Sequence, residues 1–329
     1  MVNEFAPRIA VIGCGAVFDA FYLKALKKLS DNREVNVVAL VDSNREYVKR
    51  YLKYFPSSRA FASMDADFSN LKVSRSLVLT PPSTHAEILG KLATMDSHVY
   101  CEKPLTISTA EAITVRETFS KANLLCKVGY VRRLFPNFQV IKANYSKLGS
   151  DRFLSITDGE VFRWPIKMDS IFMPEKVGGG VIWDKLSHNL DLIQWIDGIK
   201  SVDRVISNCV EGQVPVDVLV EGQTNTGGFK IAASWTESFP NMVKVSDGNN
   251  ILLSNNGIDS TLKSNLDIDV NSKTLFDVTT YEEAVEASLR EFLKLSKVDE
   301  NSILASVEES VSLTKYLSVI EASVRGIRS

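Results

Sequence analysis

The chain has 329 residues, of which 45% are hydrophobic, 24% charged and 9% aromatic. This composition is ordinary for a globular protein and excludes the collagen-like, fibrous and disordered classes. The 38 Lys and Arg residues against 40 Asp and Glu residues give a net charge of −2, so the chain lacks the basic field that nucleic-acid binding requires. The length exceeds the roughly 250–300 residues at which a single core stops growing, which predicts two domains.

The start of the chain and its cysteines predict a cytoplasmic protein without membrane segments. The most apolar runs, such as residues 37–41, are far shorter than the roughly 18 residues that a spanning helix needs. Glu4 and Arg8 precede the first apolar run, and no small-residue cleavage site follows it, which is unlike a secretory signal peptide. The cysteines form no Cys-x-x-Cys pair, so free thiols in a reducing compartment are favoured over a disulfide framework. They are Cys14, Cys101, Cys126 and Cys209.

The first part of the chain alternates short apolar runs with helical patterns, for example at Phe21, Leu23, Leu26 and Leu29. Nearly continuous apolar strands separated by helices predict a parallel sheet that is covered on both faces. Right-handed crossovers then give a doubly wound, Rossmann-like α/β domain over residues 1–125. The predicted strands are residues 9–12, 35–41, 76–79, 98–101 and 124–128.

From about residue 150 the pattern changes to strand alternation, with Phe229, Ile231 and Ala233 on one face. Turn signals such as Asn256-Gly257 separate these runs. We therefore predict an α+β domain over residues 126–329, with a largely antiparallel open sheet packed on helices on one face. Two helices are expected at residues 281–297 and 303–327.

A glycine-rich turn follows the first predicted strand and opens a helix. Gly13 permits a tight turn, and Gly15 lets a pyrophosphate approach the backbone. The helix N-terminus at Ala16 and Val17 offers free N–H groups and partial positive charge. Phe18 stands where the usual motif has a third glycine, which predicts altered packing of the helix on the strand. The alternative for such a glycine pair is a plain tight turn.

Asp42 ends the second predicted strand, about where the dinucleotide fingerprint places an acid that binds the adenosine ribose. Its carboxylate would repel a 2′-phosphate, which favours NAD over NADP. Arg45 keeps NADP open, because a nearby cation can hold that phosphate.

Three further segments are rich in polar residues. Residues 80–85 (Thr-Pro-Pro-Ser-Thr-His) and residues 101–104 (Cys-Glu-Lys-Pro) each follow a predicted strand. Both should border the cofactor, because ligands lie beyond the carboxyl ends of the strands in a doubly wound sheet. In the second domain, the glycines at 178–180 lead into a helix that carries Asp184 and His188 at i, i+4, with Asp191 extending the polar row.

In this order, the four segments resemble the glucose–fructose oxidoreductase / inositol dehydrogenase (Gfo/Idh/MocA) family of NAD(P)-dependent sugar and polyol oxidoreductases. The resemblance covers nearly the whole chain and includes Gly129-Tyr130, Arg133, Pro136 and Trp195. It implies a Rossmann domain followed by a domain whose open sheet often makes oligomer contacts, and hence a homodimer or homotetramer.

The resemblance also implies roles for single residues. Lys103 would lie beside the nicotinamide, with Asp184 and His188 completing the catalytic set, and Glu102 would bind the nicotinamide ribose. Thr80, Pro81 and His85 would line the cofactor cleft, although His85 has the alternative of being only a helix-start residue.

Oxidation of a secondary alcohol sends a hydride to the nicotinamide and a proton to a base. His188 is the best acid/base candidate because imidazole titrates near neutral pH. Asp184 could fix its tautomer or bind a substrate hydroxyl, and Lys103 could donate a hydrogen bond to the reacting oxygen. Whether Lys103 or His188 is the formal base stays open. The structural alternatives are an exposed lysine in a turn and a solvated helix pair.

No metal site is predicted, since His85, His98 and His188 have no ligand spacing among themselves or with the cysteines. An aromatic face and cations would suit a sugar ring or a phosphate, and Trp164 could equally belong to the core. The residues expected near the substrate are Tyr130, Arg132, Arg163 and Trp164.

The leading hypothesis is an oxidoreductase that uses NAD to act on a ring carbon of a sugar, cyclitol or nucleotide sugar. The alternatives are an NADPH-dependent ketosugar reductase, a non-catalytic dinucleotide sensor and a redox-assisted glycosidase that retains NAD. No motif identifies the particular sugar-like substrate.

Overall fold

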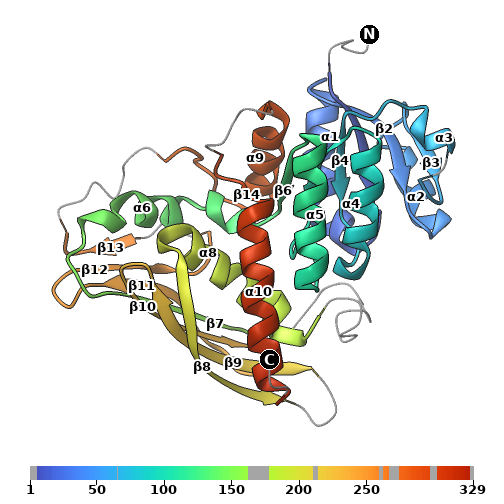
Figure 1. Ribbon diagram of the computed structural model, residues 1–329. Helices are drawn as coiled ribbons and strands as arrows, with labels where there is room; N and C mark the ends of the chain where they lie inside the picture. The colour runs from blue at the N-terminus through green and yellow to red at the C-terminus, as the bar shows by residue number, and fades with distance from the viewer. Residues whose placement is uncertain are drawn as a thin grey trace. The chain divides into compact units, whose positions relative to one another are not determined.

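The computed structural model of the protein describes residues 6–64, 66–161, 178–209, 214–258, 262–266, 274–296 and 302–326. The chain divides into two compact units (Figure 1). The first unit comprises residues 1–129 and 285–311, and the second comprises residues 130–284 and 312–329. The chain therefore passes three times from one unit to the other.

The first unit is built on a seven-stranded sheet in the order β14-β6-β5-β4-β1-β2-β3. Its strands pair in parallel except for β14, which pairs antiparallel with β6. Ile9, Ala10 and Val11 of β1 are all buried, because neighbouring side chains point to opposite faces and both faces are covered. The predicted doubly wound α/β fold is confirmed. The strands are β1 (Arg8–Ile12), β2 (Asn36–Val41), β3 (Arg59–Phe61), β4 (Arg75–Val78), β5 (His98–Cys101), β6 (Cys126–Val128) and β14 (Ala305–Ser306).

The helices of this unit begin and end at residues suited to their positions. The side chain of Asn44 accepts a hydrogen bond from the amide of Glu46 at the start of α2, and Ser108 does the same for Glu111 at the start of α5. Asn123 ends α5 in the left-handed conformation, with φ of 54°. The helices are α1 (Leu23–Asp31), α2 (Arg45–Leu52), α3 (Ala66–Ser69), α4 (His85–Thr94) and α5 (Thr109–Ala122), with a π-helix, η1 (Phe18–Tyr22), before α1.

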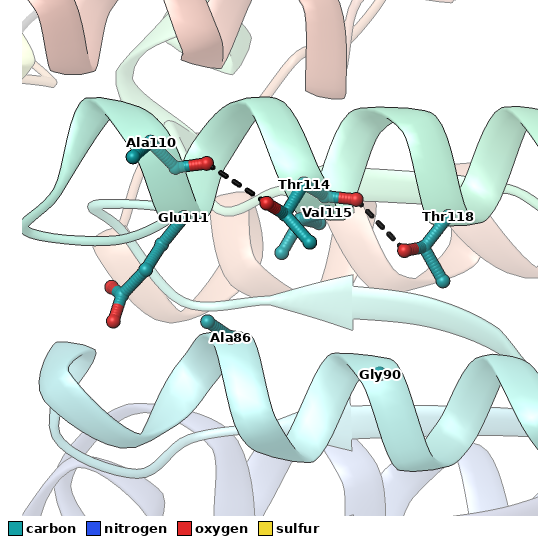
Figure 2. A pocket seen from close by; sticks show the side chains of 7 residues that line it. All are labelled: Ala86, Gly90, Ala110, Glu111, Thr114, Val115 and Thr118. Carbon is teal, nitrogen blue, oxygen red and sulfur yellow. Dashed lines mark hydrogen bonds between the residues drawn. The ribbon is translucent and has the colours of Figure 1, made fainter.

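A shallow hollow of about 220 Å³ lies between α4 and α5, which run side by side (Figure 2). Small residues such as Ala86, Gly90 and Ala110 line it. The hydroxyls of Thr114 and Thr118 donate to the carbonyl groups one turn earlier in α5. These hydroxyls are already satisfied within the helix, which leaves the Glu111 carboxylate as the remaining polar side-chain group that lines the hollow.

The C-terminal part of the chain differs from the prediction. The helix expected at residues 281–297 is α9 (Tyr281–Lys294). The helix expected at residues 303–327 begins only at Val307, as α10 (Val307–Val324). Residues 305–306 instead form β14, because Ala305 pairs with Val128 and Ser306 with Lys127 along the free edge of β6. Pairing between residues so distant in sequence leaves no trace in local periodicity.

The second unit contains a sheet in the order β13-β12-β11-β7-β10-β9-β8, in which only β10 and β7 are parallel among the described pairs. This confirms the largely antiparallel α+β domain. The strands are β7 (Arg152–Gly159), β8 (Ile199–Cys209), β9 (Pro215–Thr224), β10 (Gly227–Ser234), β11 (Phe239–Ser246), β12 (Ile251–Asn255) and β13 (Leu262–Ser264). The helical segments are η3 (Val131–Leu134), α6 (Pro136–Asn144), η4 (Tyr145–Lys147), the π-helix η6 (Ile182–Leu186) and α8 (Ser187–Asp197).

The two faces of this sheet differ. Leu154, Ile156 and Ile231 are fully buried on the face that α6 and α8 cover (Figure 1). The strand register puts Phe153, Ile206 and Met242, which lie on three different strands, on the opposite face, where they are 43%, 46% and 40% exposed. Among the described helices, none has the length and apolarity needed to cross a bilayer.

A buried ion pair connects η3 with α8 in the second unit. The guanidinium of Arg133 donates from Nη2 to Asp191 Oδ1 at 2.6 Å and from Nε to Oδ2 at 3.0 Å, and both side chains are 1% exposed. The Arg133 guanidinium also lies 5.9 Å from the ring centroid of Trp195. Two parallel hydrogen bonds offset much of the cost of burying the charges.

We expect Asp191→Ala to lower the free energy of unfolding by about 3–5 kcal/mol, because it leaves the Arg133 guanidinium buried without its carboxylate. Urea unfolding of the full chain measures this. The control is Arg204→Ala, which removes an exposed cation 3.3 Å from Glu221 and should change the midpoint little. Equal shifts for the two variants would contradict the structural role of the buried pair.

Candidate functional site

The loops that follow the parallel strands of the first unit begin side by side at the carboxyl edge of the sheet. In each case the first amide after a strand donates to the last carbonyl of the neighbouring strand. This extends the hydrogen-bond ladder by one residue, so the loops leave the carboxyl edge side by side. The bonds are Gly13 to Val41, Leu79 to Ile12, Glu102 to Val78 and Gly129 to Cys101, each with an N···O distance of 2.8 Å.

The glycine-rich turn lies at this edge. Gly13 has φ of +96°, and a Cβ there would lie 2.8 Å from the carbonyl atoms of Leu79. Only glycine fits both the backbone and the space. At Gly15 an added Cβ would meet nothing within 4 Å, so the backbone is open to an approaching group. The half-exposed Ala16 and Val17 begin the helix that follows, and the amides of a first helical turn have no partner within their helix.

Phe18 points away from the turn that it follows. Its ring is fully buried and meets Tyr51 of α2 edge-on, with 5.0 Å between centroids. The helix continues from Phe18 as the π-helix η1 rather than as an α-helix. The bulky residue is therefore accommodated by packing against α2, and the open space at Gly15 is retained.

Two backbone amides hold the carboxylate of Asp42 at the end of β2. The amide of Cys14 donates to Oδ2 and the amide of Asn44 donates to Oδ1, each at 2.8 Å. Each carboxylate oxygen keeps a lone pair that could accept a hydrogen bond from a hydroxyl group. Arg45 is exposed as the first residue of α2.

His85 is the first residue of α4, and its ring lies between two loops. Nε2 is 2.8 Å from the carbonyl oxygen of Thr80, and Nδ1 is 3.0 Å from that of Pro104 and 3.3 Å from the sulfur of Cys101. Burial lowers the pKa of His85, which favours the neutral ring, so that Nε2–H can donate to Thr80 while Nδ1 accepts from the thiol of Cys101. The ring is 0% exposed, whereas Thr80 is half-buried and Pro81 exposed. His85 thus links the loops from within.

Glu102 and Lys103 follow β5. The hydroxyl of Tyr22 donates to Glu102 Oε1, and the amide of Lys103 donates to Oε2 at 2.8 Å. Burial raises the pKa of Glu102, more than the Tyr22 hydrogen bond and the Lys103 charge lower it. Tyr100, beside Tyr22, shares a hydrogen bond of 3.0 Å with Ser288 of α9, so the returning segment of the chain supports this cluster.

The second unit carries the other predicted residues. Gly180 has φ of +54°, and a Cβ there would lie 2.2 Å from the carbonyl oxygen of Pro215, so the turn before η6 needs glycine. In η6, Asp184 Oδ2 accepts a hydrogen bond of 3.2 Å from the indole N–H of Trp235. In α8, the ring of His188 meets that of Tyr130 edge-on, with 6.1 Å between centroids.

A polar network surrounds Asp158 on the helix-covered face of the sheet. Arg132 Nη1 donates to Asp158 Oδ2 at 2.9 Å, and Lys185 Nζ lies 3.1 Å from Oδ1. Arg132 Nη1 also lies 3.0 Å from the Asn189 side-chain oxygen and 3.4 Å from that of Asn256. Burial raises the pKa of Asp158, but the two cations outweigh it and the pKa lies below its usual value. The carboxylate is therefore ionised near neutral pH.

Sequence reasoning assigned a role to Arg132 but missed Asp158 and Lys185. A signal was present, because Asp158 continues the row of Leu154 and Ile156, and a carboxylate at such a buried strand position needs partners. Two predicted substrate residues, Arg163 and Trp164, lie outside the described residues. No group of His, Cys, Asp or Glu side chains among the described residues could hold a metal ion.

Comparison with known proteins matches the first part of the chain to an oxidoreductase family and finds dehydrogenases that are similar over part of its length. Residues 7–130 match GFO_IDH_MocA, an oxidoreductase family with an NAD-binding Rossmann fold. Myo-inositol 2-dehydrogenase of Thermotoga maritima is 27% identical over 212 residues, which are 64% of this chain and 59% of that protein. UDP-N-acetylglucosamine 3-dehydrogenase of Acidithiobacillus ferrooxidans is 28% identical over 145 residues, 44% of this chain and 42% of that protein. The chain thus matches less than two thirds of the length of these relatives.

Among solved structures, the WlbA dehydrogenase of Bordetella pertussis in complex with NADH and UDP-GlcNAcA has a TM-score of 0.84. The similarity covers 99% of this chain and 97% of that chain at 15% sequence identity. At such an identity it establishes a shared fold along the chain.

The two glycines of the turn should respond differently to substitution by alanine. Gly15→Ala should weaken NADH binding by about tenfold or more, because the added methyl group occupies the open space, while stability stays unchanged. Fluorescence titration with NADH measures the affinity.

Gly13→Ala is the matched control. It should lower the free energy of unfolding by about 2–4 kcal/mol through backbone strain and the contact with Leu79. Unchanged NADH affinity in a folded Gly15→Ala protein would contradict the assignment of this turn to the cofactor.

Proposed function

We propose that the chain is a member of the Gfo/Idh/MocA oxidoreductase family, because residues 7–130 match the NAD-binding Rossmann fold of that family. The protein is an NAD(P)-dependent oxidoreductase that moves a hydride between the nicotinamide and a ring carbon of a sugar, cyclitol or nucleotide sugar. The observation that carries the proposal is the position of Lys103. It follows β5 at the same carboxyl edge of the sheet as the open glycine-rich turn.

The residues of the first unit fit a dinucleotide. The open backbone at Gly15, with Gly13, Ala16 and Val17, suits a pyrophosphate, and the fixed carboxylate of Asp42 suits the adenosine ribose. The same negative charge disfavours a 2′-phosphate and supports NAD, whereas Arg45 beside it supports NADP. Comparing NADH with NADPH affinity before and after Asp42→Ala separates the two. Further cofactor contacts are proposed for Thr80, Pro81, Glu102 and Lys103.

The bound nicotinamide supplies the hydride chemistry, and the chain positions the substrate and handles the proton. We assign to Lys103 a hydrogen bond to the reacting oxygen, which stabilises the negative charge that develops there. His188 is assigned the proton transfer, since a neutral imidazole can take a proton from a hydroxyl and return it. Asp184, oriented by the Trp235 indole, binds a substrate hydroxyl or fixes the imidazole tautomer. Tyr130, Arg132, Arg163 and Trp164 are proposed substrate contacts.

The open face of the second sheet supports a homodimer or homotetramer. Phe153, Ile206 and Met242 lie on this face with large exposed fractions, and exposed apolar side chains on one face are typical of an interface.

Substituting Lys103 or His188 should lower turnover strongly, and the His188 substitution should leave cofactor binding unchanged. Lys103→Met should lower kcat by about 100-fold or more, and His188→Asn by about 10²–10⁴-fold. NADH-linked absorbance with inositols, sugars and nucleotide sugars measures turnover, and NADH fluorescence measures binding.

The control for this pair is Lys91→Met, which removes an exposed lysine that pairs with Glu87 on α4. It should leave both measurements unchanged. Full turnover by Lys103→Met would refute the role assigned to Lys103.

The raised pKa of Glu102 makes the proposed cofactor contact sensitive to pH. A carboxylate accepts hydrogen bonds from ribose hydroxyls, and this acceptor is lost as the pH falls through the pKa of Glu102. Tyr22→Phe removes a hydrogen bond that lowers this pKa, so the pKa rises further. We therefore expect the fall in NADH affinity on acidification to begin at a higher pH in Tyr22→Phe than in the parent protein.

NADH titrations between about pH 5 and pH 8 measure this shift, since that range spans the region above the ordinary glutamate pKa. Tyr47→Phe, at an exposed position of α2, serves as the control. The same midpoint in Tyr22→Phe and the parent would contradict a ribose contact by ionised Glu102.

A further inference from the structure

Two cations share one buried carboxylate in the second unit. The side chains of Arg132 and Lys185 are 18% and 14% exposed, and that of Asp158 is 6% exposed. The Asn189 and Asn256 side-chain oxygens that also face Arg132 are neutral acceptors. Counted over the residues that the structure describes, the cluster therefore contains two cations and one carboxylate.

Among the described residues, no ion pair joins the neighbouring carboxylates of this helical segment to Arg132 or Lys185. Asp191 forms its two hydrogen bonds with Arg133, which makes a separate neutral pair. Asp184 accepts from the Trp235 indole. Within the part of the chain that the structure describes, Lys185 has Asp158 as its one ion-pair partner.

The cluster also retains unused donors. The three hydrogen bonds of Arg132 to described residues all leave from Nη1, so Nε and Nη2 donate to none of these residues. Lys185 uses one of the three ammonium donors. One cation would have been enough to neutralise Asp158. A second one, largely removed from water, is costly unless an anion completes the cluster.

We propose that Arg132 and Lys185 bind an anionic group of the substrate, either a carboxylate or a phosphate ester. Asp158 is the positioning residue, because each of its carboxylate oxygens contacts one of the two cations. This inference rests on the proposed function and narrows its substrate class to acidic sugars or cyclitols. Arg132 supplies the planar fork that matches such anions, and Lys185 a point charge.

The sequence position of Lys185 indicates where on the substrate the anionic group lies. Lys185 follows Asp184 and precedes His188 by three residues, which is less than one helical turn. Asn189, which contacts Arg132, follows His188 directly. The anionic group therefore belongs to the ring that reacts at His188, or to a substituent directly on it.

The test compares matched neutral and acidic substrates with the purified full chain. The pairs are glucose with glucuronate, galactose with galacturonate, and glucose with glucose 6-phosphate. NADH-linked rates give kcat/KM for each. The two uronates test for recognition of a carboxylate, and glucose 6-phosphate tests for recognition of a phosphate ester. The three pairs therefore distinguish the two kinds of anionic group. We expect the acidic member of at least one pair to be preferred by about tenfold or more.

Neutralising either cation should remove this preference. Lys185→Gln and Arg132→Gln should each lower the ratio of acidic to neutral kcat/KM by about 10- to 100-fold, the range for one charged hydrogen bond. Lys185→Arg should preserve the ratio. Lys230→Gln, on the opposite face of the sheet beside Glu221, should leave it unchanged. A partly unfolded preparation lowers both rates equally, so the ratio is insensitive to folding.

Failure of this inference differs from failure of the proposed function. Turnover of neutral and acidic sugars at equal efficiency, with no change in Lys185→Gln, would overturn the anion site and leave the oxidoreductase standing. If no sugar turns over, calorimetry with glucuronate and inorganic phosphate decides. Binding that Lys185→Gln abolishes supports the site, and absence of binding overturns it.

Discussion

The candidate cofactor site depends on the hydrogen bonds that carry the parallel ladder one residue beyond β1, β4, β5 and β6. They are made by backbone atoms, so the starting point of each loop is set by strand pairing and not by the loop side chains. The glycine-rich turn, the loop that contains Thr80 and the segment that contains Lys103 all begin from this common level. Side chains then hold the loops in place locally. The buried ring of His85 lies against the carbonyl oxygen of Thr80, and Asp42 accepts a hydrogen bond from the amide of Cys14.

In the second unit, the adjacent residues Arg132 and Arg133 are both largely buried, but their charges are balanced in different ways. Arg133 and Asp191 form a closed pair with matched charges and parallel hydrogen bonds. Arg132, the preceding residue, joins a group in which cations outnumber carboxylates. The Arg133–Asp191 pair needs no further partner to balance its charges, and it holds η3 against α8. The group around Arg132 has donors to spare, as binding sites do, and this contrast separates a structural arginine from a proposed ligand-binding one.

Much of this architecture could be predicted from sequence, because its signals are local. Continuous apolar strands, the Gly13 turn and the alternation around Ile231 each depend on residues close together in the chain. The fold of both units followed from them. Pairings between distant residues could not be predicted in this way. The two-residue strand β14, the Arg133–Asp191 pair and the partners of Asp158 form only once the sheets exist. At Phe18, the missing glycine indicated altered packing, but the partner ring of Tyr51 could not be inferred.

The return of residues 285–311 to the first unit bears on how the protein is made. On the ribosome, β6 emerges well before Ala305 and Ser306, which pair with its outer edge. The ring of Tyr100 likewise emerges long before Phe292, whose ring centroid lies 5.8 Å away in the finished protein. Throughout translation of the intervening segment, the nascent nucleotide-binding fold carries an open sheet edge and an incomplete core. Such an edge attracts other extended chains, so this stage of biosynthesis is when chaperone protection would matter most.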